Sequence, residues 1–201
     1  MLENPLYEDN HLLIVNKPAG LLTQPSGTAQ DSLESRWKQW VKEKYQKPGN
    51  VFLEAIHRLD KPVSGIVVFA KTSKALSRMH QAERKKIYTA LLEKEPEIPQ
   101  ATLQHYLVHD EYHARVDPNG KLSILHYKVI DKKRVEIELE TGRYHQIRAQ
   151  FAAIGCPIVG DVKYGSCTTL PGGVIYLHHS RVELVHPVSE NGLVIECPSP
   201  F

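Results

Sequence analysis

Short apolar stretches typical of β-strands recur along the chain, with only three helical patterns between them. The clearest strand pattern lies in residues 134–140, where Val135, Ile137 and Leu139 alternate with charged side chains. Further strands are predicted at residues 11–15, 51–56, 66–70, 87–92, 174–177, 181–185 and 193–196. Because the strands come in runs rather than in strict alternation with helices, we expect an α+β fold with a mixed, mainly antiparallel central sheet.

The three helical patterns predict helices that flank this sheet, at residues 31–45, 72–84 and 144–154. Asp31 and Glu34 have the spacing of a capping box at the first helix, and Thr72 is the expected N-cap of the second. The third helix should end at Gly155. The first helix has an apolar stripe, for which a place in the core is favoured over a base-stacking platform: Leu33, Trp37, Trp40 and Val41.

Two segments between these elements are predicted to be irregular. Residues 93–100 are polar and contain two prolines, which is typical of an exposed loop or linker. Residues 117–120, with the sequence Asp-Pro-Asn-Gly, have the composition of a hairpin turn.

The composition indicates an ordinary globular protein. The chain has 201 residues, of which 41% are hydrophobic and 24% charged, so it is long enough for one domain with its own core. No apolar run approaches the roughly 18 residues of a membrane span, so no membrane partner is expected. Three cysteines without close spacing exclude a disulfide framework and a four-cysteine zinc site. A reducing cytoplasm is therefore the expected location.

Positive charge is concentrated in two segments, although the formal net charge is only +2. Residues 71–86 hold six Lys or Arg against one Glu, and residues 36–47 hold five against one Glu. Clustered cations can bind a polyanion such as RNA. Two solvated helix faces explain the same pattern, and charge alone favours that interpretation.

The segment His57-Arg58-Leu59-Asp60 lies in an irregular link between two apolar strands. A carboxylate in such a place is partly removed from water and can act as a nucleophile or a base. From the local sequence alone, an Asp60 that caps a turn and pairs with Arg58 is the favoured interpretation.

A second polar cluster, residues 142–148, precedes and enters the third predicted helix. Gly142 permits an unusual backbone there, and the three-residue spacing of His145 and Arg148 places them on one helix face. With Arg143, they form a group of donors that suits a phosphate or a buried carboxylate. An exposed helix start remains the alternative.

A third candidate is Tyr88, which follows a basic stretch within a predicted strand. Lys86 and Tyr88 are two residues apart, so in a strand they share a face and can offer a charge to a phosphate and a ring to a base. A tyrosine of the core is the alternative. The spacing of His and Cys matches no usual metal site.

Together these segments resemble the RluA-type pseudouridine synthases. The matching stretches follow the order of that family and are residues 15–25, 57–72, 84–91, 141–165 and 176–187. The pairing of HRLD at 57–60 with GRYHQIR at 142–148 is specific to the family. The chain departs from the usual family pattern at Pro62, Val63, Tyr144, Cys156 and His179, where acidic, Thr, Thr, His and Ala residues are common.

The resemblance implies an isomerase that converts specific uridines of ribosomal or transfer RNA into pseudouridine. It implies a pseudouridine synthase fold with a catalytic cleft, and one catalytic domain over residues 1–201 without a separate N-terminal RNA-binding domain. Neither a cofactor nor a metal is chemically required, because a base–sugar bond is broken and a new one formed without redox change or net hydrolysis. We expect an RNA stem-loop as the partner and a monomeric enzyme.

By the same resemblance, Asp60 is the catalytic carboxylate, Tyr88 stacks on the flipped-out base, and Arg148 pairs with Asp60. Asp60 either attacks the anomeric carbon or acts as a base that starts a glycal route. Arg58 enters the RNA, and Leu177 forms an apolar wall of the base pocket. RNA contacts are also expected from His57, Arg143, His145 and Lys86, with Lys71, Lys74 and Arg78 as further candidates for phosphates.

Two rival functions follow from the same residues. A non-catalytic RNA-binding module would bind RNA tightly and give no product. A nucleoside hydrolase that uses Asp60 with Glu54 would release free uracil and leave an abasic site, whereas an isomerase leaves the mass of the RNA unchanged.

Overall fold

The computed structural model describes residues 4–27 and 31–201, and the chain divides into two compact units. The first unit holds the chain up to Arg84 together with Arg181–Pro198, and the second holds Lys85–Ser180 with Ser199–Phe201.

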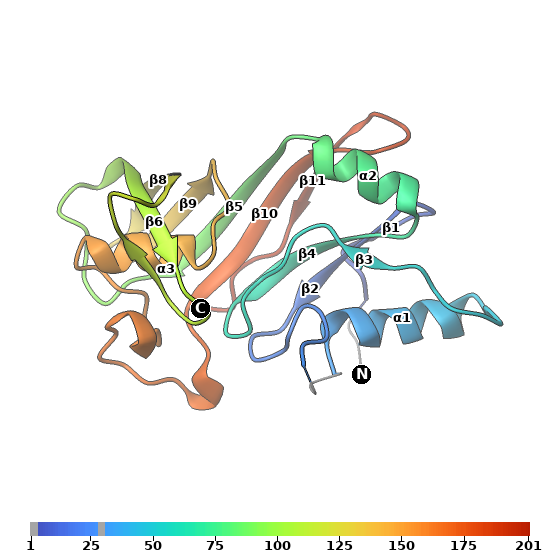
Figure 1. Ribbon diagram of the computed structural model, residues 1–201, viewed down its shortest axis with the longest axis horizontal. Coiled ribbons are helices and arrows are strands. Elements are labelled where there is room, and N and C mark those ends of the chain that lie inside the picture. The colour runs from blue at the N-terminus through green and yellow to red at the C-terminus, as the bar shows by residue number, and fades with distance from the viewer. Residues whose placement is uncertain (1–3, 28–30) are drawn as a thin grey trace. The chain divides into compact units, whose positions relative to one another are not determined.

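Two long strands connect the units along the chain (Figure 1). β5 (Arg84–Leu91) begins in the first unit and ends in the second, and β10 (Leu177–Val185) leads back. Within the described residues, no helix is long and apolar enough to cross a membrane.

In the part of the chain that the structure describes, five strands and part of a sixth form the sheet of the first unit. They are β1 (Tyr7–Glu8), β2 (Leu12–Lys17), β3 (Glu54–Ala55), β4 (Ser64–Ala70) and β11 (Gly192–Glu196), with residues 181–185 of β10. β2 pairs with β4 in a register that places Leu12 opposite Ala70, and β1 and β3 extend this pair. β11 pairs with β10.

The central strands of this unit are buried on both faces. Residues 12–15 and 66–70 have no exposed surface, so β2 and β4 read as continuous apolar runs rather than as alternating patterns. On one face, α2 (Ser73–Gln81) joins the core through Ala75 and Met79. The Thr72 hydroxyl accepts a hydrogen bond from the backbone N–H of Ala75, which confirms the predicted N-cap.

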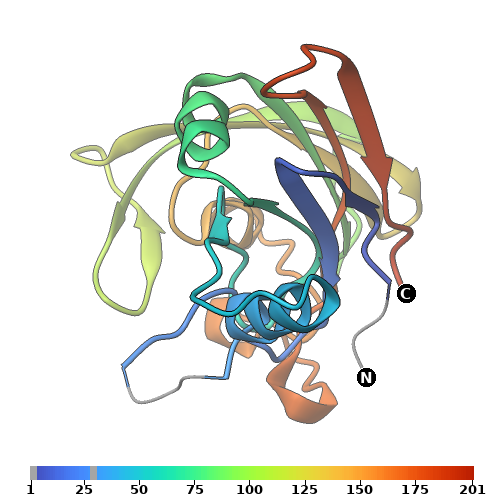
Figure 2. The ribbon, with the colours of Figure 1, turned by 90° about the vertical axis from the view of Figure 1, so that its right-hand side faces the viewer.

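The helix α1 (Leu33–Lys44) lies on the other side of these strands from α2 (Figures 1 and 2). Leu33, Trp37 and Val41 have 1–2% of their surface exposed, so the predicted apolar stripe is a core contact. Trp40 is half-buried, and its ring meets that of Trp37 edge-on at 4.9 Å.

The second unit is built on an antiparallel sheet with the strand order β5–β9–β8–β6–β7. Its further strands are β6 (Gln100–His109), β7 (Ala114–Val116), β8 (Lys121–Asp131) and β9 (Arg134–Leu139). Val135, Ile137 and Leu139 are buried, which confirms the alternating pattern read from the sequence. The α+β class and the mainly antiparallel sheet are likewise as predicted.

The helix α3 (Gln146–Ala153) packs on β6 and β7 of this sheet. Ala149 of α3 joins Leu107, Ala114 and Tyr164 in one apolar cluster. The helix ends before Gly155, as expected, but it begins two residues later than the pattern indicated.

Two predicted strands are wrong. Residues 51–56 contain only the short strand β3, and the rest of the segment is irregular. The side chains of Leu53 and Ile56 in this irregular segment are nevertheless buried. Burial alone, without strand pairing, therefore produced the apolar pattern. Residues 174–177 precede β10, which is one strand from Leu177 to Val185.

The predicted capping box of α1 is also wrong. Ser32 is the N-cap, and its hydroxyl accepts from the backbone N–H of Ser35 while the Ser35 hydroxyl accepts from the backbone N–H of Ser32. Asp31 instead forms a two-fold ion pair with Arg36.

A turn forms at residues 117–120, with the Gly120 N–H donating to the Asp117 carbonyl at 2.9 Å. It joins β7 to β8, which lie on opposite sides of β6, so it is not a hairpin turn between paired strands. Glycine is required at its end because a Cβ on Gly120 would lie 2.4 Å from the backbone of Leu107.

Candidate active site

The loop that carries Asp60 is fixed to the strand that follows it. The backbone N–H of Val68 in β4 donates to His57 Nε2 at 3.3 Å, and the N–H of Val63 donates to the Asp60 carbonyl at 3.0 Å. Arg58 is exposed, whereas Asp60 is half-buried. The arrangement holds the carboxylate at the edge of solvent and leaves Arg58 to reach outward. His57 therefore has a structural role in addition to the RNA contact predicted for it.

The Thr23 side chain also fixes this loop, through two hydrogen bonds to the backbone of Leu59. Its hydroxyl donates to the Leu59 carbonyl at 2.9 Å and accepts from the Leu59 N–H at 3.1 Å. Both residues are buried, at 3% and 6% exposure. One side chain thus satisfies both backbone groups of the residue directly before Asp60.

Lys17 ties this loop to the turn after β2. The side chain has no exposed surface, and Nζ donates to the carbonyls of Leu21 at 2.7 Å, Pro18 at 3.1 Å and Lys61 at 3.3 Å. Burial lowers the pKa of Lys17 to about 8, and the charge of Asp60 opposes that shift. Sequence reasoning missed this role. The available signal was a lysine that ends an otherwise apolar strand.

In the second unit, Arg148 holds a buried carboxylate. Its Nε and Nη2 donate to the two oxygens of Asp161 at 2.7 Å and 2.9 Å, and the two residues have 5% and 1% exposure. Its guanidinium also lies 4.8 Å from the ring centre of Tyr164. Of the two ligands expected for the donors at this helix, a buried carboxylate is the one found. Asp161 was missed from the sequence, and the predicted pairing of Arg148 with Asp60 stays a prediction.

The unusual backbone at the start of α3 lies at His145 rather than at Gly142. His145 is the N-cap with φ 49° and ψ 25°, in the left-handed region, which costs a non-glycine residue free energy. Gln146 supports this turn, because its Oε1 accepts from the Thr141 hydroxyl at 2.8 Å and from the Arg143 N–H at 3.0 Å.

His145 and Arg148 share a face, as predicted, because both contact Tyr164. His145 Nδ1 lies 2.9 Å from the Tyr164 hydroxyl, which also accepts from the Ala114 N–H. Burial, followed by the nearby charges of Arg148 and Lys163, lowers the pKa of His145 to about 3. The imidazole is therefore neutral at physiological pH and adds no charge for a phosphate.

Tyr88 is buried in β5 at 6% exposure, opposite Ile137 of β9. Its ring stacks on the imidazole of His179, with centroids 4.5 Å apart and planes at 17°. The departure from the usual family residue at position 179 therefore places a second ring against one face of Tyr88.

The other predicted residues of this unit lie in β5, at the start of β10 and before α3. Lys86 precedes Tyr88 by two residues on the same strand, and its Nζ is 3.6 Å from the position that a Cβ on Gly142 would take. Leu177, at 3% exposure, begins β10. Arg143 is exposed and donates to the Leu122 carbonyl at 3.3 Å.

Residues 11–153 match the family model described as RNA pseudouridylate synthase. The chain belongs to this family. It is 37% identical to an uncharacterized RNA pseudouridine synthase, YhcT, of Bacillus subtilis, over 97% of this chain and 68% of that protein. It is 30% identical to ribosomal large subunit pseudouridine synthase C of Rickettsia prowazekii (98% and 68% covered) and 36% identical to synthase D of Nitrosomonas europaea (97% and 61% covered).

This pseudouridine synthase spans about two thirds of the length of those relatives. Among solved structures, its fold is similar to that of human RNA pseudouridylate synthase domain containing 4, with a TM-score of 0.79 and 22% identity over 98% of this chain and 88% of that one. Human RNA pseudouridylate synthase domain containing 1 gives a TM-score of 0.74 and 21% identity over 100% of this chain and 87% of that one. The resemblance read from the sequence is confirmed: the protein is an isomerase that acts on RNA.

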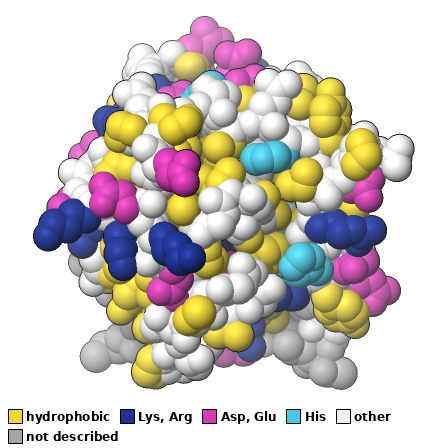
Figure 3. Space-filling model, turned by 90° about the vertical axis from the view of Figure 1, so that its left-hand side faces the viewer, with side chains coloured by type: hydrophobic (Ala, Val, Ile, Leu, Met, Phe, Trp, Pro, Cys, Tyr) yellow, Lys and Arg dark blue, Asp and Glu magenta, His cyan; other side chains and the backbone are white. Residues whose placement is uncertain are grey.

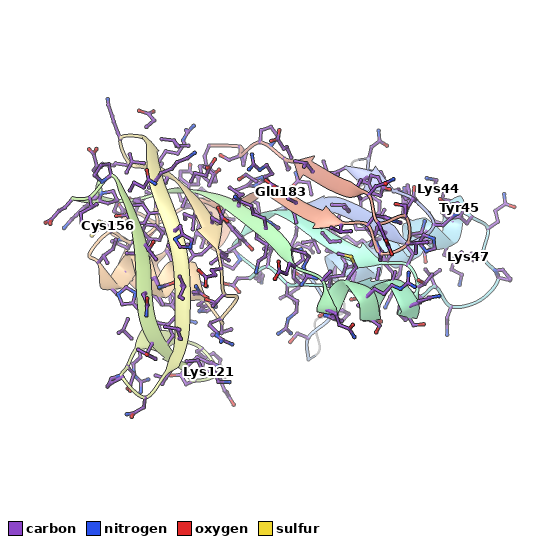
Figure 4. The ribbon with its side chains drawn as sticks, turned by 90° about the horizontal axis from the view of Figure 1, so that it is seen from above. Lys44, Tyr45, Lys47, Lys121, Cys156 and Glu183 are labelled. Carbon is purple, nitrogen blue, oxygen red and sulfur yellow. The ribbon has the colours of Figure 1, made fainter. Side chains whose placement is uncertain are left out.

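Several cations of the two basic segments form ion pairs. In residues 36–47 the pairs are Arg36–Asp31, Lys38–Glu34 and Lys44–Glu8. In residues 71–86, Lys71 pairs with the same Glu8. Lys44 and Lys47 lie beside Tyr45 at the end of α1, 5.3 Å and 6.0 Å from its ring centre (Figure 4). The Lys71 side chain is only 8% exposed, so its position favours a structural role over a phosphate contact.

Proposed function

We propose that the protein converts specific uridines of ribosomal or transfer RNA into pseudouridine, with Asp60 as the catalytic carboxylate. The observation that carries this proposal is the HRLD loop, in which Asp60 is half-buried on a backbone held by Thr23 and Lys17. A carboxylate fixed in this way can be brought to one atom of a substrate without a large loss of entropy.

The chemistry needs one bond broken and one formed. The bond between N1 of uracil and C1′ of ribose breaks, the uracil turns, and its C5 bonds to C1′, after which the C5 hydrogen leaves as a proton. Asp60 either attacks C1′, as a carboxylate does in retaining glycosidases, or removes a ribose proton to start a glycal route. In the first route the C5–C1′ bond displaces the carboxylate from C1′, and in the second Asp60 returns its proton to C2′ as the C5–C1′ bond forms, so Asp60 ends unchanged in both.

The target uridine has to leave its stack to reach Asp60, at a cost of a few kcal/mol. We propose that Tyr88 stacks on the flipped base and assists the final proton transfer, and that Leu177 forms the apolar wall beside it. Arg58 takes the place that the base leaves, and Arg148 pairs with Asp60 to keep the carboxylate ionised and aimed. Arg143, His57, His145 and Lys86 complete the contacts with the RNA.

The relatives named for the large ribosomal subunit favour a ribosomal target, with transfer RNA as the second candidate. We propose the cytoplasm as the place of the reaction, as for a bacterial relative that acts on ribosomal RNA. We further propose a monomer that binds a stem-loop with this chain alone.

Pseudouridine mapping tests the proposal. Wild type, Asp60→Asn and Glu54→Gln proteins are incubated with unmodified ribosomal and transfer RNA transcripts, and carbodiimide treatment followed by primer extension locates any product. We expect one set of stops with wild type and Glu54→Gln, and none with Asp60→Asn.

Other outcomes contradict the proposal in separate ways. Stops with Asp60→Asn at the wild-type rate remove Asp60 from the chemistry. Bound RNA without stops from any protein favours the binding module, and free uracil that depends on Glu54 favours the hydrolase.

A further inference from the structure

The exposed rings of His109 and Tyr144 lie 5.2 Å apart on the second unit, and the Tyr144 hydroxyl contacts the turn that carries a third exposed ring, Tyr112. We call His109, Tyr112 and Tyr144 the ring surface. His109 ends β6, Tyr112 lies in the turn to β7, and Tyr144 stands at the entry to α3. Tyr112 is 69% exposed and Tyr144 is 38% exposed. Figure 3, which looks onto this unit, shows hydrophobic side chains and histidines on the surface among charged ones. Exposed aromatic rings in a group need an explanation other than core packing.

The turn that carries Tyr112 is held in shape by its own side chains. Asp110 Oδ1 accepts from the backbone N–H groups of Tyr112 at 2.8 Å and of His113 at 2.7 Å. The Tyr144 hydroxyl donates to the Glu111 carbonyl at 3.3 Å, which joins the turn to the entry of α3. The rings are therefore pre-arranged, and a ligand that binds them loses little entropy in ordering them.

A continuous series of ring contacts leads from this surface to Arg148. The ring of Tyr144 lies 5.2 Å from His109 and stacks on His145 at 3.8 Å and 19°. His145 is hydrogen-bonded to Tyr164, over which the Arg148 guanidinium lies. The ring surface is thus separated from the candidate catalytic arginine by two side chains.

The charges around the rings favour an anion. Arg115, Arg143 and Lys163 are exposed, and Lys163 Nζ lies 5.9 Å from the Tyr112 ring centre. The acidic side chains of this turn are Asp110, which accepts from the backbone, and Glu111. Rings that stack on bases, flanked by cations for the backbone, are the combination that binds unpaired nucleotides.

We propose that the ring surface binds an unpaired nucleotide of the RNA substrate near the target uridine, with a base stacked on Tyr144 or Tyr112 and its phosphates on the flanking cations. The inference rests on the proposed function, since it takes RNA as the ligand. It assigns a role to Tyr144, one of the positions where this chain departs from the usual family residue. The stack with neutral His145 keeps the Tyr144 ring in one plane.

Equilibrium binding of a labelled single-stranded oligouridylate tests this surface directly. We expect Tyr144→Thr to weaken binding about five- to hundred-fold, because one base–aromatic stack is lost, and Tyr144→Phe to bind like wild type. Tyr106→Ala is the matched control, since Tyr106 is 48% exposed on β6 but does not belong to the ring surface. A perfectly paired RNA duplex should bind wild type, these variants and Tyr112→Ala equally.

The outcomes separate this inference from the proposed function. If wild type forms pseudouridine but Tyr144→Thr and Tyr112→Ala keep full affinity for the oligouridylate, the ring surface is not an RNA site, and a protein partner becomes its better explanation. An equal loss in Tyr106→Ala also overturns the inference. If no RNA is modified while binding still depends on Tyr144, the ring surface stands and the proposed function fails. Thermal melting of each variant confirms that it is folded.

Discussion

At the scale of single residues, the buried polar groups of the site have specific partners. Arg148 and Asp161 form a two-fold ion pair, and the Thr23 hydroxyl binds both backbone groups of Leu59. Removal of one partner is costly, because the other stays buried with its desolvation penalty. A substitution that removes one partner should therefore change the free energy of unfolding measurably.

The Arg148–Asp161 pair should not tolerate a lysine. An ammonium cannot donate to both carboxylate oxygens in the fixed geometry of a guanidinium, so we expect Arg148→Lys to lower the free energy of unfolding by about 1–3 kcal/mol. Arg148→Ala should lower it by about 3–5 kcal/mol. Urea unfolding measures both changes, with Arg143→Lys as the exposed control. Equal stabilities for the two lysine variants would show that the ion pair contributes nothing.

His145 should make stability depend on pH. Its pKa is about 3 in the folded protein, against 6.5 for an ordinary histidine. Between these values the unfolded chain binds a proton that the folded chain does not, so stability falls as the pH drops below about 6.5. His145→Gln should remove this part of the decrease. Unfolding curves from pH 7 to pH 4 measure it, and an unchanged pH dependence in the variant would contradict the assignment.

At the scale of elements, the site depends on a loop that has almost no regular structure of its own. The HRLD loop is positioned by Lys17 at the end of β2, by Thr23 in the segment after that strand, and by β4. Its shape is therefore set by side-chain hydrogen bonds to backbone rather than by a strand ladder or a helix.

Thr23→Val tests the two hydrogen bonds of Thr23 with little change of shape. Valine leaves the buried N–H and carbonyl of Leu59 without the hydroxyl, so we expect a loss of about 2 kcal/mol in stability and a lower kcat with unchanged RNA affinity. Thr23→Ser keeps the hydroxyl and should stay close to wild type in both. A kcat of Thr23→Val equal to that of Thr23→Ser would mean that these hydrogen bonds do not position Asp60.

Elements with a clear period could be predicted from the sequence, and those held by distant partners could not. The alternation in β9 and the Thr72 cap of α2 are local signals, and both are confirmed. Lys17 binds the Lys61 carbonyl 44 residues away, and Asp161 pairs with Arg148 13 residues away, so the neighbouring sequence did not identify these partners. Leu53 and Ile56 are buried although they lie in a loop. Hydrophobicity alone does not distinguish such a buried loop from a strand.

At the scale of the whole molecule, the chain divides its candidate catalytic residues between its two compact units. Asp60 belongs to the first unit, and Tyr88 and Arg148 belong to the second. The net charge is only +2, and Arg36, Lys38, Lys44 and Lys71 of the basic segments are held in ion pairs. We therefore expect recognition of the RNA to depend on a small number of placed side chains more than on general electrostatic attraction.

The central claim, that Asp60 drives isomerisation of uridine in RNA, is tested most directly by tritium release. Formation of the C5–C1′ bond expels the hydrogen on C5, so RNA transcribed with uridine tritiated at C5 releases tritium to water only when pseudouridine forms. We predict release by wild type, with an intact RNA chain and no free uracil, and none by Asp60→Asn. Free uracil, or release by Asp60→Asn at the wild-type rate, would contradict the account.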